Sequence, residues 1–194
     1  FIQRSACNTL QVLSNGSAYI CSRVGAAGGI DAVVAAMSVY AYDNEVQLSG
    51  LLLLHTLMRV DGQNELCVEA LYNADGIAVV TSAMKAHQAD VSIQEKACGV
   101  ILSFSRQRAI GSSQNQRKCV QCIMSSLRLH PENESVQQLG CAALWHLVDS
   151  SFFVGNLLAE GPEAALTSAA ERFPESAGGW CQRILEKLSS EMEV

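Results

Sequence analysis

Cysteine is the residue type that most directly suggests chemistry in this sequence. Eight of the 194 residues are cysteine, and Cys119 and Cys122 have the C-x-x-C spacing of zinc sites and thioredoxin-like redox sites. A structural zinc site needs a second pair of ligands. The nearest candidates, His130 and Cys141, do not form such a pair. We therefore predict no metal site and no cofactor, and stoichiometric zinc in the purified protein would contradict this.

Two further motifs fall short of a catalytic site. His146 is followed three residues later by Asp149, which would lie beside it on the surface of a helix. A catalytic base also needs a nucleophile oriented against it, so a structural or peptide-contacting role is favoured. The glycine-rich residues 25–29 lack the Lys-Ser/Thr of a phosphate-binding loop. They are predicted to form a linker or a tight crossing, and the chain is predicted not to be an enzyme.

Composition excludes several other classes of protein. Only 16% of the residues are charged, compared with about 25% in typical globular proteins, so a large buried core is expected. The net charge of −6 and the absence of any Lys/Arg cluster argue against nucleic-acid binding. The longest uncharged interval, residues 5–22, is too polar for a membrane span. No signal peptide precedes the apolar pattern at Phe1, so we expect an excerpt of a longer chain.

Internal repetition organises the chain. Residues 29–37 match residues 76–84 at an offset of 47, which also relates Leu54 to Ile101. Offsets of 43 and then about 41 lead to later copies, and an offset of 44 leads back to a half copy at the start. Such periods are typical of repeats built from two or three helices. We predict one domain over 1–194 with about four and a half repeats, approximately 1–14 (partial), 15–60, 61–105, 106–148 and 149–190.

Each repeat is predicted to be helical. Apolar residues recur at spacings of four, four and three, as in Val46, Gly50, Leu54 and Leu57, which is one face of a 3.6-residue period. This third helix of the repeat follows a second helix, predicted over 30–40, 77–87 and 120–130, and a shorter first helix, predicted over 17–25, 64–73 and 151–158. The polar residues 111–116 are predicted to be loop-like. A turn at 173–175 is predicted in the last repeat.

Polar residues also recur at fixed places in the repeat. Three of them directly precede third helices and are predicted N-caps: Asp43, Asp90 and Asn133. Positions that are equivalent in successive repeats form a column. One column holds glutamine in four repeats and is predicted to make a capping or inter-repeat hydrogen bond: Gln3, Gln47, Gln94 and Gln137. Two histidines that end second helices are predicted to face the turns: His87 and His130.

The repeated motif resembles the armadillo repeat. It reads Gly-Ile-x-x-Val-x-x-Ala-Met, a polar turn, and then Val-Gln-x-x-Gly-Cys-x-x-Leu-x-x-Leu. The resemblance covers essentially the whole chain and implies an all-α fold, a right-handed α-α superhelix or armadillo-like solenoid. HEAT repeats are the nearest alternative. The small residue at Gly50, Ala97, Gly140 and Ala6 fits a close crossing of the third helix.

The resemblance also implies a binding site. In armadillo proteins such as importin α and β-catenin, the third helices line a concave groove that holds extended peptides or partner helices. Carried over column by column, that groove comprises Arg4, Asn8, Leu48, Leu52, Thr56, Glu95, Gly99, Ser103, Gln138, Ala142, His146, Arg183 and Lys187. The Asn and Trp arrays of importin α are absent from these columns. The resemblance therefore implies a peptide groove with a different lining.

The cysteines fall largely in apolar columns of the repeat. Cys7, Cys98 and Cys141 share the column of Leu51, and Cys119 takes the place of Gly76. Cysteines at such positions behave as small buried hydrophobic residues. Equivalent residues of successive repeats lie too far apart for a disulfide. We therefore predict buried, reduced thiols and a cytoplasmic location.

Together these features predict a non-enzymatic scaffold that binds a protein or peptide partner, with no nucleic acid and no membrane. Ile2, Leu10 and Leu13 leave an apolar stripe unmatched, so additional repeats or subunits are predicted to pack on the N-terminal end. The polar Arg183, Glu186 and Lys187 indicate a capping last helix. The alternative is a regulatory armadillo-like region of a larger enzyme, a kinase or a ubiquitin ligase, whose catalytic domain lies outside this segment.

Overall fold

The computed structural model describes residues 2–15, 17–59, 65–107, 112–148 and 151–192, and nearly all of them are helical. No strand occurs within these ranges. The elements are α1 (Ile2–Ser14), α2 (Ala18–Ala26), α3 (Gly29–Val39), α4 (Asn44–Arg59), α5 (Glu65–Asn73), α6 (Gly76–Ala86), α7 (Val91–Arg106), α8 (Ser113–Leu129), α9 (Glu134–Leu147), α10 (Ser151–Ala159), α11 (Glu163–Arg172), the short π-helix η1 (Pro174–Gly178) and α12 (Gly179–Met192). The predicted all-α fold is confirmed.

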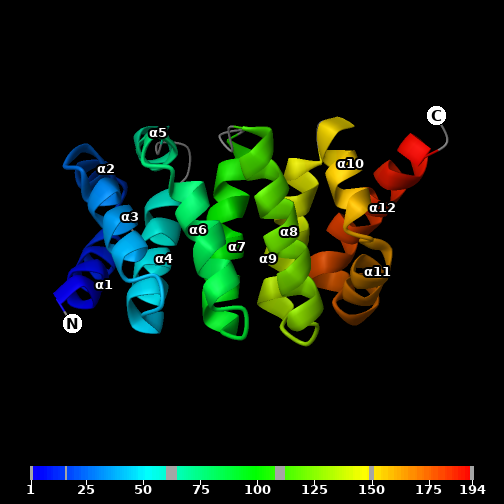
Figure 1. Ribbon diagram of the computed structural model, residues 1–194, viewed down its shortest axis with the longest axis horizontal. Helices are drawn as coiled ribbons and strands as arrows, with labels where there is room; N and C mark the ends of the chain where they lie inside the picture. Colours follow the sequence, from blue (N-terminus) through cyan, green and yellow to red (C-terminus); the bar gives the residue numbers. More distant parts are fainter. Residues whose placement is uncertain (1, 16, 60–64, 108–111, 149–150, 193–194) are drawn as a thin grey trace.

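The helices form a stack with the two ends of the chain at its opposite ends (Figure 1). The third helices α1, α4, α7, α9 and α12 pack against one another in sequence, whereas the second helices α3, α6, α8 and α11 contact one another less closely. The short first helices α2, α5 and α10 lie along one edge (Figure 1). The third helices therefore form one continuous layer of the stack, and the second helices form another. This is the predicted helical-repeat solenoid.

One hydrophobic core runs through the stack, from Cys7 in α1 to Leu188 in α12. The predicted apolar stripe lies inside it, because Leu54, Ile101 and Leu144 are all 0% exposed. In α1, by contrast, Leu13 is 54% exposed, because α1 packs mainly against α2 and α4. The apolar stripe is therefore buried in the repeats where a second helix packs against the third helix.

Side chains at the turns fix where the third helices begin. Asp43 accepts hydrogen bonds from the backbone N–H of Val46, Asp90 from that of Ile93, and Asn133 from that of Val136, all at 2.9–3.0 Å. Each bond satisfies a donor that a helix start leaves without an intrahelical partner. All three predicted N-caps are confirmed.

The glutamine column caps the ends of the second helices. The Gln47 side-chain N–H donates to the carbonyls of Met37 and Tyr40, at 2.7 and 2.9 Å. Gln94 and Gln137 make the same pair of bonds in their own repeats. Gln94 also accepts a hydrogen bond from the Ser126 hydroxyl of the next repeat. The glutamine column therefore makes the predicted capping bonds and, at Gln94, the predicted inter-repeat bond. Gln3, in the half repeat at α1, is exposed.

The two turn-facing histidines connect successive repeats. His87 Nε2 lies 2.9 Å from the carbonyl oxygen of Ala41, and His130 Nε2 lies 2.7 Å from that of Gln88. Each ring thus bonds to the turn one repeat earlier. The prediction that these histidines face the turns is confirmed.

Glycine begins two second helices because the chain doubles back tightly there. A Cβ at Gly29 would lie 2.8 Å from the carbonyl oxygen of Val24, and one at Gly76 would lie 2.9 Å from that of Leu71. These are backbone atoms, which cannot move aside easily. Residues 25–29, where α2 ends and α3 begins, therefore form the predicted tight crossing.

The prediction of a loop over residues 111–116 is wrong from Ser113 onward. There α8 begins, and it continues without a break to Leu129, with Ser112 as its N-cap. Polar side chains are compatible with the exposed first turns of a long helix, and no glycine or proline interrupts residues 113–129. Because this repeat has no tight crossing, Cys119 can occupy the column held by Gly76.

The turn predicted at 173–175 is part of a π-helical segment. Residues 174–178 form η1, in which the backbone N–H of Gly178 donates to the carbonyl of Phe173 at 3.0 Å. This segment leads directly into α12. The last third helix is therefore reached through a continuous helical bend and not through an open turn.

Within the described ranges, no single helix is long and apolar enough to cross a membrane. Residues 19–26 and 29–39 together pass a test of length and composition, but they are bent by 67° from each other. Buried side chains of α3, such as Ile30 and Met37, belong to the core of the stack.

Candidate protein-binding groove

The third helices bring most of the predicted groove residues to one accessible face. Eleven of them are partly or fully exposed: Arg4, Asn8, Leu48, Leu52, Thr56, Glu95, Ser103, Gln138, His146, Arg183 and Lys187. Gly99 and Ala142 are buried. The His55 ring explains the burial of Gly99, because it lies 2.7 Å from where a Cβ would be. At Gly99 the groove floor is therefore covered by the preceding repeat.

The N-terminal part of the groove is an open hollow of about 580 Å³ between α1 and α4. Its lining includes Arg4, Asn8, Leu48 and Leu52, together with Ser5, Thr9, Glu45 and Ser49. Arg4 forms an ion pair with Glu45 across the two helices. Four predicted groove residues from two successive repeats thus border one space that mixes polar and apolar side chains.

The middle of the groove is polar, but its hydroxyl groups are already occupied. The Thr56 hydroxyl donates to the carbonyl of Leu52 at 2.9 Å, and that of Ser103 donates to the carbonyl of Gly99 at 3.1 Å. Lys96 donates to the Glu95 carboxylate at 2.6 Å. The exposed amide of Gln138 lies beyond them on α9. The hydroxyl oxygens can still accept hydrogen bonds, and the Gln138 amide can donate and accept them.

The C-terminal end of the groove contains an aromatic and cationic cluster. The guanidinium carbon of Arg183 lies 5.9 Å from the ring centre of Trp145 and 5.7 Å from that of Trp180. The His146 ring lies 5.8 Å from that of Trp180. Asp149, the predicted neighbour of His146, falls outside the described residues. Sequence columns identified His146 and Arg183 but missed both tryptophans, although these are the only two in the chain.

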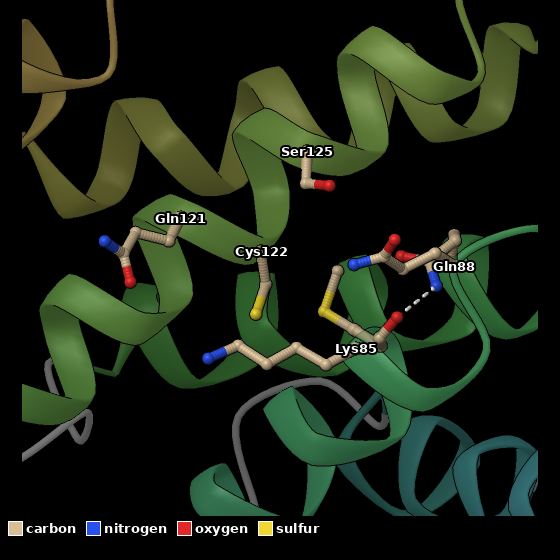
Figure 2. Close-up of a pocket in the computed structure, with 7 residues that line it drawn as sticks. Lys85, Gln88, Gln121, Cys122 and Ser125 are labelled. Atoms are coloured by element: carbon tan, nitrogen blue, oxygen red, sulfur yellow. Dashed lines mark hydrogen bonds between the residues drawn. The ribbon is translucent and has the colours of Figure 1, made fainter.

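A separate small pocket lies between the second helices α6 and α8 (Figure 2). Lys85, Gln121, Cys122 and Ser125 surround it, and the Gln94 amide donates to the Met84 carbonyl at its wall. Its volume is about 70 Å³, far below the roughly 300–1,000 Å³ of ligand pockets. Burial raises the pKa of the Cys122 thiol to about 11, which disfavours a nucleophilic thiolate. The pocket therefore does not fit a catalytic or cofactor site.

All eight cysteines are free and buried, as predicted for core positions. Within the described residues, no group of three or more His, Cys, Asp or Glu side chains is placed to hold a metal ion. The sulfur atoms of Cys141 and Cys181 lie 3.3 Å apart. These two residues belong to adjacent repeats but to neighbouring columns, so the column analysis did not bring them together.

Because the thiols are buried, the protein is expected to become less stable at alkaline pH. Burial raises the pKa of Cys98 from 9.0 to about 12. The stabilisation from this neutral thiol is full below about pH 9 and is lost as the pH rises toward 12, because unfolding then releases a proton. We expect the melting temperature to fall between about pH 8 and about pH 10.5, and to fall less in Cys98→Ala. Equal pH dependence in the two proteins would contradict this.

The stacked helices, the glutamine caps and the continuous layer of third helices define an armadillo-type helical-repeat protein. The family model described as "LRRK2 ARM repeat" matches residues 27–179, and the chain therefore belongs to the LRRK2 ARM repeat family.

Among solved structures, the chain is similar to one described as "Crystal Structure of Engineered Protein. Northeast Structural Genomics Consortium Target OR329". The TM-score is 0.73 at 18% sequence identity, and the similarity covers 96% of this chain and 73% of that one. At this identity the likeness supports the fold alone. No curated protein matches the sequence significantly.

Proposed function

We propose that this chain is a non-enzymatic protein-interaction scaffold that binds a peptide or a partner helix along the groove of third helices. Membership of the ARM repeat family supports a role in protein interaction. The observation that carries the groove assignment is the hollow of about 580 Å³, where Arg4, Asn8, Leu48 and Leu52 meet. The hollow is open to solvent, spans two successive repeats and borders both polar and apolar side chains, so a peptide segment can lie along it.

The proposal includes a cytoplasmic location and a partner that is neither nucleic acid nor membrane. The free, buried thiols support a reducing compartment. The net charge of −6 argues against nucleic acid. The regulatory alternative, in which a kinase or ligase domain lies elsewhere in a longer protein, stays a prediction that the sequence of the whole protein decides.

The groove assignment can be tested with peptides selected from a random phage-displayed library against the folded chain. Asn8→Arg and Gln138→Arg change exposed groove positions. We expect at least one of them to weaken the selected peptides by about tenfold, as substitution of an interface residue commonly does. Affinity is measured by fluorescence anisotropy, and circular dichroism verifies that helicity is unchanged.

The matched control is Val39→Arg, because Val39 is 74% exposed and lies on the second helix α3. This variant should bind the selected peptides as the natural chain does. If Val39→Arg abolishes binding while both groove variants bind normally, the binding face is the layer of second helices and the proposal is wrong.

A further inference from the structure

Arg183 lies near two aromatic rings that come from different repeats. Trp145 lies on α9, whereas Trp180 and Arg183 lie on α12, and both ring centres are within 6 Å of the guanidinium carbon. A cation over an indole face is attracted by the negative charge of that face. These two contacts favour conformations of the side chain in which the guanidinium stays beside the rings. An anchor ordered in advance loses less entropy on binding.

Three arginines of this chain have their guanidinium groups paired with carboxylates, which reduces their availability to a partner. Arg4 pairs with Glu45, Arg128 with Glu160 and Arg172 with Glu132. Within the described part of the chain, Arg183 has no such carboxylate partner, although Glu186 lies only three residues along α12. Stacking uses the faces of the guanidinium and leaves its N–H donors available in the plane. Arg183 is exposed and can therefore donate to a binding partner.

Two cations, Arg183 and Lys187, lie on one side of α12, where Glu186 is also exposed. Lys187 lies one helical turn after Arg183 and is partly exposed. The planar guanidinium fork matches a carboxylate, with which it forms two parallel hydrogen bonds. The indole rings beside it can pack against the carbon chain of an acidic residue or an apolar neighbour. Tryptophan and arginine are also the residue types most often found at binding hot spots.

We propose that the cluster of Trp145, Trp180 and Arg183 binds a glutamate or aspartate side chain of a partner protein's acidic segment. This inference rests on the proposed groove function and adds the chemistry of the partner at its C-terminal end. The partner segment carries its carboxylate to the Arg183 guanidinium and an apolar residue to the indole rings. Lys187 adds attraction for a second acidic residue nearby in the segment.

The two tryptophans make this site directly observable, because they are the only ones in the chain. Intrinsic tryptophan fluorescence therefore reports on the cluster alone. The probes are peptides selected from a random phage-displayed library against the natural chain, each synthesised also with every Glu and Asp replaced by Gln and Asn. We expect enrichment of acidic residues in the selected peptides, and a change in tryptophan emission that saturates on titration of the acidic form only.

Arg183→Gln should weaken these peptides about tenfold or more, because it removes charge-assisted hydrogen bonds. Arg183→Lys keeps the charge but loses the planar fork, so its affinity should be intermediate. The matched control is Arg117→Gln, since Arg117 is an exposed arginine on the second helix α8 and the change in net charge is the same. This control should bind within about twofold of the natural chain.

Several outcomes would overturn the inference. The inference is wrong if the selected peptides are not enriched in acidic residues, or if the amide-substituted peptides bind as tightly as the acidic ones. It is also wrong if Arg183→Gln leaves the affinity unchanged, or if the peptides bind only after their serines are phosphorylated. If the peptides lose affinity in Asn8→Arg but not in Arg183→Gln, the groove function stands and only the acidic site is wrong. If they lose affinity only in Val39→Arg, the groove function itself is wrong.

Discussion

Gly76→Ala is expected to destabilise the protein by about 1–3 kcal/mol, as overpacking of a tight site commonly does. The added Cβ would lie 2.2 Å from Leu71 Cδ1 and 2.9 Å from the backbone carbonyl oxygen of Leu71. The leucine side chain can rotate away, but the carbonyl belongs to α5 and moves only if the crossing between α5 and α6 opens. The free energy of unfolding is measured by urea denaturation.

Gly155→Ala provides the matched control, because Gly155 lies on α10 with nothing within 4 Å of an added Cβ. Alanine in a helix is favoured over glycine by about 0.5–1 kcal/mol, so this variant should be as stable as the natural chain or more stable. The two identical substitutions are thus expected to act in opposite directions. Equal effects at both positions would show that the crossing at Gly76 is not tight in solution.

The elements that sequence predicted well are those with a local physical signal repeated along the chain. The N-caps at Asp43, Asp90 and Asn133 need only a short polar side chain before an apolar period. The Gln94 column is visible because the same residue recurs at the same place in each repeat. Repetition averages out the ambiguity of any single segment, and this is why the stacked architecture could be predicted without a structure.

The features that sequence missed depend on how columns of neighbouring repeats meet. Gly99 was assigned to the groove, but the His55 ring of the preceding repeat covers it. Trp145 and Trp180 stand in columns beside the predicted ones, and only the packing of α9 on α12 brings them to Arg183. A column analysis compares equivalent positions of the repeats. It does not describe how the helices of one repeat are displaced in space relative to those of the next. Contacts between different columns are therefore beyond it.

Ending the chain after Val148 is expected to cost more stability than any single substitution discussed above. The shortened protein lacks α10, α11, η1 and α12, which cover α8 and α9. Cys141, Leu144 and Val148 are each 0% exposed in the full stack. Covering one large apolar side chain contributes about 1.5–3 kcal/mol, so uncovering this face should cost several kcal/mol and reduce solubility.

The stacked repeats also make a prediction about cooperativity. Each repeat in a solenoid is stabilised by its interfaces with its neighbours, so removing the polar end repeat weakens the coupling as well as the total stability. The thermal unfolding transition, followed by circular dichroism, should become broader and shift to lower temperature. A chain ending after Ser190 keeps all the buried residues of α12 named above and loses the exposed Glu191 and the residues after it, so it serves as the control, with an unchanged transition expected. An equally sharp transition at an unchanged temperature after the cut at Val148 would show that α9 needs no cover, and that α12 is not the cap of the stack.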